Sequence, residues 1–241
     1  MAQKKKKKKV VKIKVKNVII LLSILLAIIG LFYYALTMPV KNIYIKGNEI
    51  ITDYEIMKQA SLDTYPSFIL TKKSYLKNTL LKNSYIKDAK VTKKLGNIIN
   101  LDITEYQRIA LTTDNKIILS NGAILENNYN LSDIPILING INTKEIHLDF
   151  ALKFSKVDKN ILRQISQIEY SPVEVDAERF LLYMNDGNLV YITLTKIEKL
   201  NKYNGIKDKL NDKKGIIYID SGDYVELKKE VQPNNLDQPA Q

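Results

Sequence analysis

Two serines have the S-x-x-K spacing that could support acyl transfer. In penicillin-binding enzymes this motif activates a serine nucleophile through a nearby lysine. The spacing occurs here as Ser74 with Lys77 and as Ser84 with Lys87. Those enzymes also need the partner motifs S-D-N and K-T-G, and neither is present in this chain of 241 residues. We interpret both matches as chance pairs in a lysine-rich sequence and predict no catalytic residue.

Other residue types that perform chemistry are scarce. The chain has no cysteine, which excludes disulfides, thiolate nucleophiles and cysteine metal sites. His147 is the single histidine, so no multi-histidine site can form, and we interpret it as a surface or half-buried side chain. Asp220 and Asp223 flank Gly222 in a pattern typical of a turn. The sequence therefore predicts no metal site and no bound cofactor.

The positive charge of the chain is concentrated at its N-terminus. Nine lysines and no acidic residue precede residue 17, including Lys4, Lys9 and Lys16. The remainder carries a net charge of only about +2, whereas a nucleic-acid-binding domain would place its basic residues on a folded face. We therefore predict no nucleic-acid partner, and we expect the tail at residues 1–17 to contact anionic lipid headgroups.

The segment after this tail is long and apolar enough to span a membrane. Residues 18–36 contain no charged side chain, and about 20 apolar residues cross a hydrocarbon core. Tyr33 and Tyr34 near the far end are typical of the membrane interface. We predict a transmembrane helix at residues 18–38, anchored by the side chains of Val18, Leu22, Leu26, Phe32, Tyr33 and Tyr34.

The lysine distribution also predicts the orientation of this anchor. Basic residues favour the cytoplasmic side, so the N-terminus is expected inside and the bulk of the chain outside, a single-pass type II topology. A cleaved signal peptide would have a shorter apolar region and small residues at the cleavage site. The sequence around Ala35 and Leu36 lacks that pattern, which favours an uncleaved anchor.

Residues 39–107 read as a small module with the order strand, helix, helix, strand, strand. Ile43 and Ile45 alternate with polar neighbours, and Thr52 with Glu55 forms the spacing of a helix capping box. A second amphipathic helix is expected near residues 72–82, followed by strands at 86–94 and 99–103. Helices on one face of such a sheet would bury both apolar faces.

Residues 108–230 are rich in predicted strands. Asn121 and Gly122 favour a type I′ hairpin, and a second hairpin is expected around Gly187. A helix face is expected from apolar residues at spacings of three and four, namely Phe154, Val157, Ile161, Ile165 and Ile168. A lysine-rich helix interrupted at Gly205 and two closing strands follow, and residues 231–241 read as a disordered tail.

The pattern of the first module resembles a POTRA domain. The resemblance rests on a strand ending in K-G-N, a capped helix and the closing strands at residues 85–91 and 99–105. Placed after one transmembrane helix, this module resembles the FtsQ/DivIB family of bacterial cell-division proteins, and residues 134–140 resemble a turn of that family's β-domain. The resemblance implies an α+β chain with a POTRA domain at 39–107 and a β-domain of mixed sheet with helices at 108–230.

The same resemblance implies a function and a set of partners. Family members are non-enzymatic scaffolds at the division septum that bind bitopic FtsB/DivIC-like and FtsL-like proteins and help regulate septal cell-wall synthesis. A membrane-anchored POTRA chaperone or secretion module remains an alternative, although such proteins usually carry several POTRA repeats or a barrel. An anchored cell-wall enzyme is a further alternative, for which the partner motifs are missing.

The last strand of the β-domain is the expected partner-binding site. An edge strand leaves backbone N–H and C=O groups unpaired, so that a partner strand can add to it. We expect Val225 and Leu227 to face the core of the domain. The outward-facing side chains, and a neighbour on the preceding strand, are the predicted contacts: Tyr224, Glu226, Lys228 and Tyr218.

Overall fold

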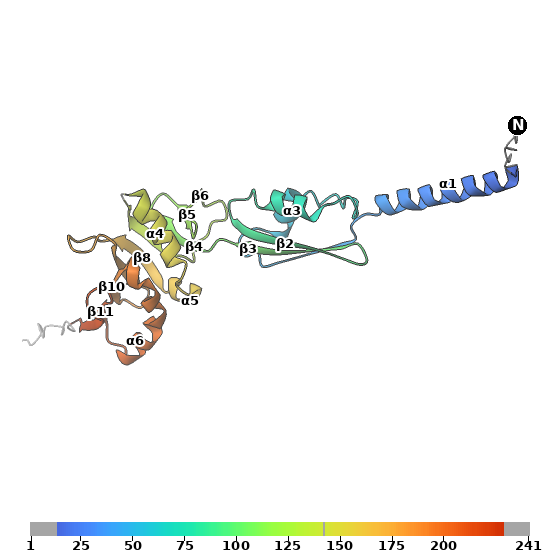
Figure 1. Ribbon diagram of the computed structural model, residues 1–241. Coiled ribbons are helices and arrows are strands. Elements are labelled where there is room, and N and C mark those ends of the chain that lie inside the picture. The colour runs from blue at the N-terminus through green and yellow to red at the C-terminus, as the bar shows by residue number, and fades with distance from the viewer. Residues whose placement is uncertain (1–13, 142, 229–241) are drawn as a thin grey trace, which may run out of the picture. The chain divides into compact units, whose positions relative to one another are not determined.

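The computed structural model describes residues 14–141 and 143–228. The chain divides into two compact units, Met1–Glu105 and Tyr106–Gln241, and each is described by itself. The first unit begins with helix α1 (Val15–Thr37; Figure 1). Its side chains are all unburied, and it is long and apolar enough to cross a membrane. Lys16 lies in its first turn, whereas Lys4, Lys9 and the tail at 231–241 lie outside the described residues.

The rest of the first unit has the predicted order of elements. It consists of β1 (Asn42–Lys46), α2 (Asp53–Gln59), α3 (Lys73–Leu80), β2 (Ile86–Lys94) and β3 (Ile98–Glu105). The strands form one sheet in the order β1-β3-β2, with β1 parallel and β2 antiparallel to β3 (Figure 1). The prediction of a POTRA fold from strand and helix order is confirmed.

Local sequence explains why these elements form. The Glu55 N–H donates to Thr52 Oγ1 at 3.3 Å and the Thr52 N–H donates to Glu55 Oε2 at 2.9 Å, which completes the predicted capping box at the start of α2. On β3 the alternating Ile99, Leu101 and Ile103 are buried beneath the two helices. The polar residues between them point to the other face, as the period of a strand requires.

The second unit contains one nine-stranded mixed sheet and several short helices. Its strand order is β12-β11-β10-β9-β8-β7-β4-β5-β6, in which the β4–β7, β7–β8 and β10–β11 pairs are parallel. The elements along the chain are β4 (Arg108–Thr112), β5 (Lys116–Leu119), β6 (Ile124–Glu126), β7 (Ile136–Asn139), α4 (Lys144–Phe154), α5 (Lys159–Leu162), β8 (Ile165–Tyr170), β9 (Arg179–Met184), β10 (Leu189–Thr193), the 3₁₀ helix η1 (Leu194–Lys202), α6 (Tyr203–Lys209), β11 (Gly215–Tyr218) and β12 (Tyr224–Leu227).

The core of this unit lies between the helices and the sheet. Three phenylalanines are its centre, because Phe150 of α4 lies 4.5 Å from Phe154 and 5.3 Å from Phe180 of β9, measured between ring centroids. Tyr203, at the start of α6, is fully buried in the same cluster. Aromatic pairs of this kind bury large apolar area and fix the position of the helices over the sheet.

The helix predicted from Phe154 to Ile168 does not form as one element, since Phe154 ends α4, Val157 lies between the helices and Ile161 lies in α5. Ile165 and Ile168 lie in strand β8 and not on a helix with Phe154. The pairing of β8 with β9 has an irregularity between Ile165 and Gln167, which lets two residues three positions apart face the same side of the sheet. Both isoleucines are therefore buried, with a spacing that also suits a helix.

Two further local predictions need correction. The hairpin at residues 119–123 forms, but Gly122 alone of the Asn-Gly pair has a positive φ, +82°, so the turn is a three-residue loop and not type I′. The lysine-rich helix changes from 3₁₀ to α geometry at Tyr203, two residues before Gly205. Strand β4 was not predicted at all.

Candidate functional site

Strand β12 forms one edge of the nine-stranded sheet. Among the strands that the structure describes, it pairs only with β11, in antiparallel fashion, with Glu226 opposite Ile216 and Val225 opposite Ile217. The Lys228 N–H donates to the Lys214 carbonyl at 2.8 Å, and this bond shows which residues of β12 form hydrogen bonds with β11. In an antiparallel pair every second residue bonds to the neighbour, so Val225 and Leu227 direct their N–H and C=O groups to the open side.

The side chains of β12 differ in exposure. Tyr224 is 51% exposed, and Glu226 is exposed on the same face of the sheet. Val225 is half-buried on the opposite face and packs against the core. Leu227 lies on the same face as Val225, but it is 48% exposed and so does not pack into the core as predicted. Lys228 is exposed beyond the end of the strand, and its Nζ donates to the Gly187 carbonyl at 3.2 Å.

Three tyrosines form a stack across the last strands. Tyr191 of β10 and Tyr218 of β11 have ring centroids 5.3 Å apart, and Tyr218 lies 4.6 Å from Tyr224 of β12. The Arg179 guanidinium of β9 lies 3.8 Å above the Tyr191 ring. Burial, and then the charge of Glu226, raises the pKa of Tyr218. The stack gives the edge a continuous aromatic face.

A largely buried ion pair supports this face. Arg179 Nε donates to Asp220 Oδ2 at 2.7 Å, and both side chains are mostly shielded from solvent. Lys196 Nζ also donates to the backbone carbonyl of Asp220 at 2.6 Å. Asp220 therefore has a specific charged partner in addition to its predicted place in the turn. Asp223, with a φ of +56°, bonds Lys199 at 2.5 Å, and this hydrogen bond lowers the pKa of Asp223.

A groove opens beside β12 on the other face of the sheet. It has a volume of about 580 Å³ and lies between α6 and the last two strands. Its floor is apolar and includes Ile206, Leu210 and Val225, whereas Lys202 and Lys209 lie on its rim. Such a groove suits an apolar side chain flanked by an acidic one.

A buried polar network positions the start of β11. Asn188, 1% exposed, accepts a hydrogen bond from the Gly215 N–H at 2.9 Å and donates to the Tyr203 hydroxyl at 3.0 Å. That hydroxyl donates to the Asp186 carboxylate at 2.8 Å. Burial opposes ionisation of Asp186, but hydrogen bonds from the Asn188 N–H, Tyr203 and Lys207 outweigh it and lower the pKa of the Asp186 carboxyl. The network ties β11, and so its neighbour β12, to the core.

Similar proteins are found in bacterial cell division. Residues 38–106 match the model for the POTRA domain of FtsQ type. The chain is 30% identical over 214 residues to the cell division protein DivIB of Bacillus subtilis (strain 168), covering 86% of this chain and 81% of the relative. It is also 30% identical over 232 residues to DivIB of Listeria monocytogenes, covering 92% of this chain and 84% of the relative. The chain belongs to the DivIB family of cell-division proteins.

One solved structure is similar to this DivIB-family chain. It is described as the major extracytoplasmic domain of the trans isomer of DivIB from Geobacillus stearothermophilus, with 28% sequence identity and a TM-score of 0.38. The match covers 45% of this chain and 96% of the other. The family assignment rests on the sequence matches, and the apolar helix α1 fits a single-pass membrane protein.

The residues with possible catalytic spacing lie in the first unit, whereas His147 lies in the second. Ser74 is exposed on α3, and its S-x-x-K partner Lys77 forms an ion pair with Asp88 at 2.7 Å. His147 is half-buried on α4, as predicted, with Nε2 3.1 Å from the Gly122 carbonyl. Among the residues that the structure describes, no group of three or more His, Cys, Asp or Glu could hold a metal ion.

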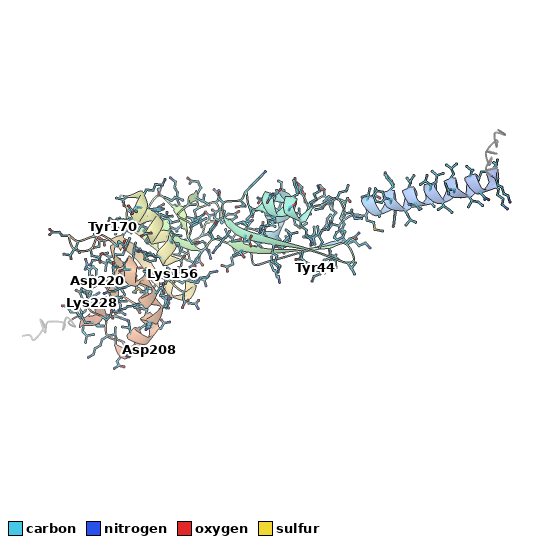
Figure 2. The ribbon with its side chains drawn as sticks, viewed as in Figure 1. Tyr44, Lys156, Tyr170, Asp208, Asp220 and Lys228 are labelled. Atoms are coloured by element: carbon cyan, nitrogen blue, oxygen red, sulfur yellow. The ribbon has the colours of Figure 1, made fainter. Side chains whose placement is uncertain are left out.

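The structure places all four predicted edge residues within its last two strands or directly after them, and it adds others. Figure 2 labels two residues of this region, Asp220 and Lys228. Sequence reasoning missed Arg179, Tyr191 and the lysines on the groove rim. The alternation in β9 and β10 shows which face these residues occupy. It does not show that β10 pairs with β11 in parallel with Tyr191 opposite Tyr218.

Proposed function

We propose that this DivIB-family protein is a non-enzymatic scaffold of the bacterial division machinery. It binds other bitopic division proteins, FtsB/DivIC-like and FtsL-like, through the β12 edge. By holding them together it helps regulate septal cell-wall synthesis. The open edge of β12 carries this proposal, because Val225 and Leu227 present backbone groups that pair with none of the residues that the structure describes, beside an apolar groove.

The chemistry of the edge supports strand addition. A partner strand beside β12 would exchange hydrogen bonds with Val225 and Leu227, which gives affinity with little sequence preference. Its alternate side chains would lie over Tyr224 on one face and over the groove on the other. Selectivity would come from those side chains, since Lys202 and Lys209 favour an acidic neighbour next to an apolar anchor.

The membrane topology is part of the same proposal. The N-terminus lies in the cytoplasm, α1 crosses the cell membrane, and both folded units act outside the cell at the division septum. The nine lysines before residue 17 support this orientation, and they would hold anionic lipid headgroups on the cytoplasmic side. A membrane-tethered scaffold needs only binding surfaces to bring other membrane proteins together.

The full-length chain in mild detergent would be used as bait against the membrane proteins of the source cell. The test variants are Tyr224→Lys and Tyr218→Lys, and Tyr44→Lys on β1 is the matched control, since Tyr44 is 59% exposed and lies in the other unit (Figure 2). The proposal expects capture of a small bitopic coiled-coil protein by the native chain and the control, with loss in the edge variants.

The other outcomes separate function from site. Capture that survives both edge substitutions would leave the scaffold in place and move the binding site away from β12. Capture of translocated polypeptides or wall fragments, with no bitopic division protein, would overturn the scaffold. Surface plasmon resonance with the two purified proteins then decides whether the contact is direct.

A further inference from the structure

One end of the POTRA unit is tied directly to the residues that follow α1. The Phe68 N–H donates to the Met38 carbonyl at 2.8 Å, and Met38 is the residue after the last one of the helix. The Val40 N–H donates to the Pro66 carbonyl at 2.9 Å. These bonds hold the loop that contains residues 65–70 beside the end of α1.

A second loop is tied to the same stretch. The turn between β2 and β3 contains Leu95 and Asn97, and Asn97 Nδ2 donates to the Pro39 carbonyl at 2.9 Å. The Lys41 N–H donates in turn to the Asn97 carbonyl at 2.9 Å. Both loops are therefore bonded to residues 38–41, whatever the orientation of the rest of the unit.

Large apolar side chains stand exposed on these two loops. Leu95 is 97% exposed, Leu70 64%, Ile69 49% and Tyr65 48%. We call these four residues the proximal pad. Single exposed apolar residues are common on protein surfaces, but a group of them at loop tips marks a contact surface.

The two loops are also fixed to each other. Lys93, at the end of β2, donates from Nζ to the Thr71 carbonyl at 3.0 Å and to the Phe68 carbonyl. The same ammonium lies 4.2 Å from the centroid of the Phe68 ring. Lys93 lies two residues before Leu95 in the chain, and its side chain bonds the other loop, so the pad is a preformed surface and not two independent loops.

The rim of the pad is basic. Lys41, Lys72, Lys73 and Lys94 are exposed, and within the described part of the chain none of them forms an ion pair. Asp63 is the acidic residue nearest to the pad in sequence. An apolar centre with lysines around it matches the membrane interface, where lysine stems lie along apolar surface and their charges reach headgroups.

We propose that the proximal pad inserts into the interface of the membrane that α1 crosses, with the surrounding lysines on anionic headgroups. The proposal rests on the anchoring by α1 proposed above. The interfacial layer on each side of a bilayer is only about 5–8 Å thick. Both loops of the pad are bonded to residues 38–41, which directly follow the end of α1, so the pad reaches this layer without any extended linker. The contact would fix the orientation of the POTRA unit relative to the membrane and thereby limit where its partners can bind.

The absence of cysteine allows a direct test in the full-length protein. Single cysteines are introduced as Ile69→Cys and Leu95→Cys and labelled with an environment-sensitive fluorophore. Tyr54→Cys is the matched control, because Tyr54 is 65% exposed and lies near the opposite end of β3. The eight residues of β3 separate the two ends by about 23 Å. The protein is reconstituted in vesicles of phosphatidylcholine with and without phosphatidylglycerol, at one chain per vesicle or fewer.

The expected result is a blue-shifted emission and several-fold weaker quenching by aqueous iodide at both pad positions, with neither change at position 54. The shift should be larger when phosphatidylglycerol is present, because the lysine rim then adds to the apolar contact. One chain per vesicle removes a second copy as the source of the apolar surroundings.

Two outcomes would overturn different claims. A fourth label at Leu25→Cys reports on α1 itself, since residue 25 lies in the middle of the helix. If position 25 is shielded while the pad positions are quenched as fully as position 54, the anchor stands and the pad proposal is wrong. If position 25 is also open to iodide, the anchoring that both proposals need is wrong.

Discussion

A proline at Leu227 would test the open edge of β12 at a single donor. The Leu227 N–H points away from β11, so Leu227→Pro removes a donor that bonds nothing within the sheet. Proline is tolerated in edge strands where the N–H faces outward. Glu226→Pro is the opposing variant, because the Glu226 N–H points inward and its loss breaks the ladder to Ile216.

The structure sets the size of the expected effect. A partner strand that adds to β12 would lose one hydrogen bond and keep an unpaired carbonyl, which costs about 1–3 kcal/mol. At 1.4 kcal/mol per factor of ten, the dissociation constant should rise by roughly 5- to 140-fold. The free energy of unfolding should change by less than about 1 kcal/mol, since the Lys228–Lys214 bond and the inward pairs remain.

Binding and stability must be measured on the same samples. The dissociation constant for the captured bitopic partner is measured by biolayer interferometry with the full-length chain, and unfolding is followed by circular dichroism. Leu227→Ala removes the 48% exposed side chain but keeps the N–H, so it isolates the backbone effect. Equal affinities for Leu227→Pro and Leu227→Ala in folded proteins would refute strand addition at β12.

Three further substitutions test the supports of the fold, each by chemical denaturation. Thr52→Ala removes the side chain that caps α2 and should lower the free energy of unfolding by about 1 kcal/mol. Tyr203→Phe removes the buried hydroxyl bonded to Asp186 and should cost about 1–3 kcal/mol. The pKa of Asp186 is lowered in the folded chain, so its contribution is lost as pH falls through that value, and Tyr203→Phe should move this loss to higher pH. Asp220→Asn leaves the shielded Arg179 without its charged partner and should cost about 1–3 kcal/mol, without changing the unfolding of the POTRA unit.

The POTRA unit could be predicted from sequence because its information is local. The capping box at Thr52 and the alternation of Ile99, Leu101 and Ile103 each specify one element without reference to distant residues. The short connections then leave few ways to pair three strands. The structure accordingly has the predicted helices and strands within a few residues of their expected bounds.

The large sheet could be predicted only in part, because its order depends on long-range pairing. Strand β7 lies between β4 and β8, both in parallel, and hairpin signals say nothing about such neighbours. The error at Ile165 and Ile168 has a local cause. The irregular pairing of β8 with β9 places two residues three positions apart on one face of a strand, and this spacing is also typical of a helix. Periodicity alone cannot separate these two cases over six residues.

The edge site, too, could be predicted from the sequence only in part. Its position at the end of the sheet followed from chain order, and the exposed Tyr224 and Glu226 followed from alternation. The exposure of Leu227 did not follow, because alternation gives the face of a residue but not how far the covering helix extends over that face. The groove likewise depends on where α6 packs, which only the folded chain determines.

The sheet has a second open edge, and it separates an edge effect from a site effect. Strand β6 ends the sheet at the other side, and Ile124 resembles Leu227 in being 48% exposed with an outward N–H. If unpaired backbone alone recruits the partner, Ile124→Pro should weaken binding as much as Leu227→Pro. We expect Ile124→Pro to leave the dissociation constant unchanged within about twofold, because the tyrosine stack and the groove beside β12 supply most of the selectivity. Equal losses at both edges would mean that the partner reads only exposed strand, and the groove would then have no part in recognition.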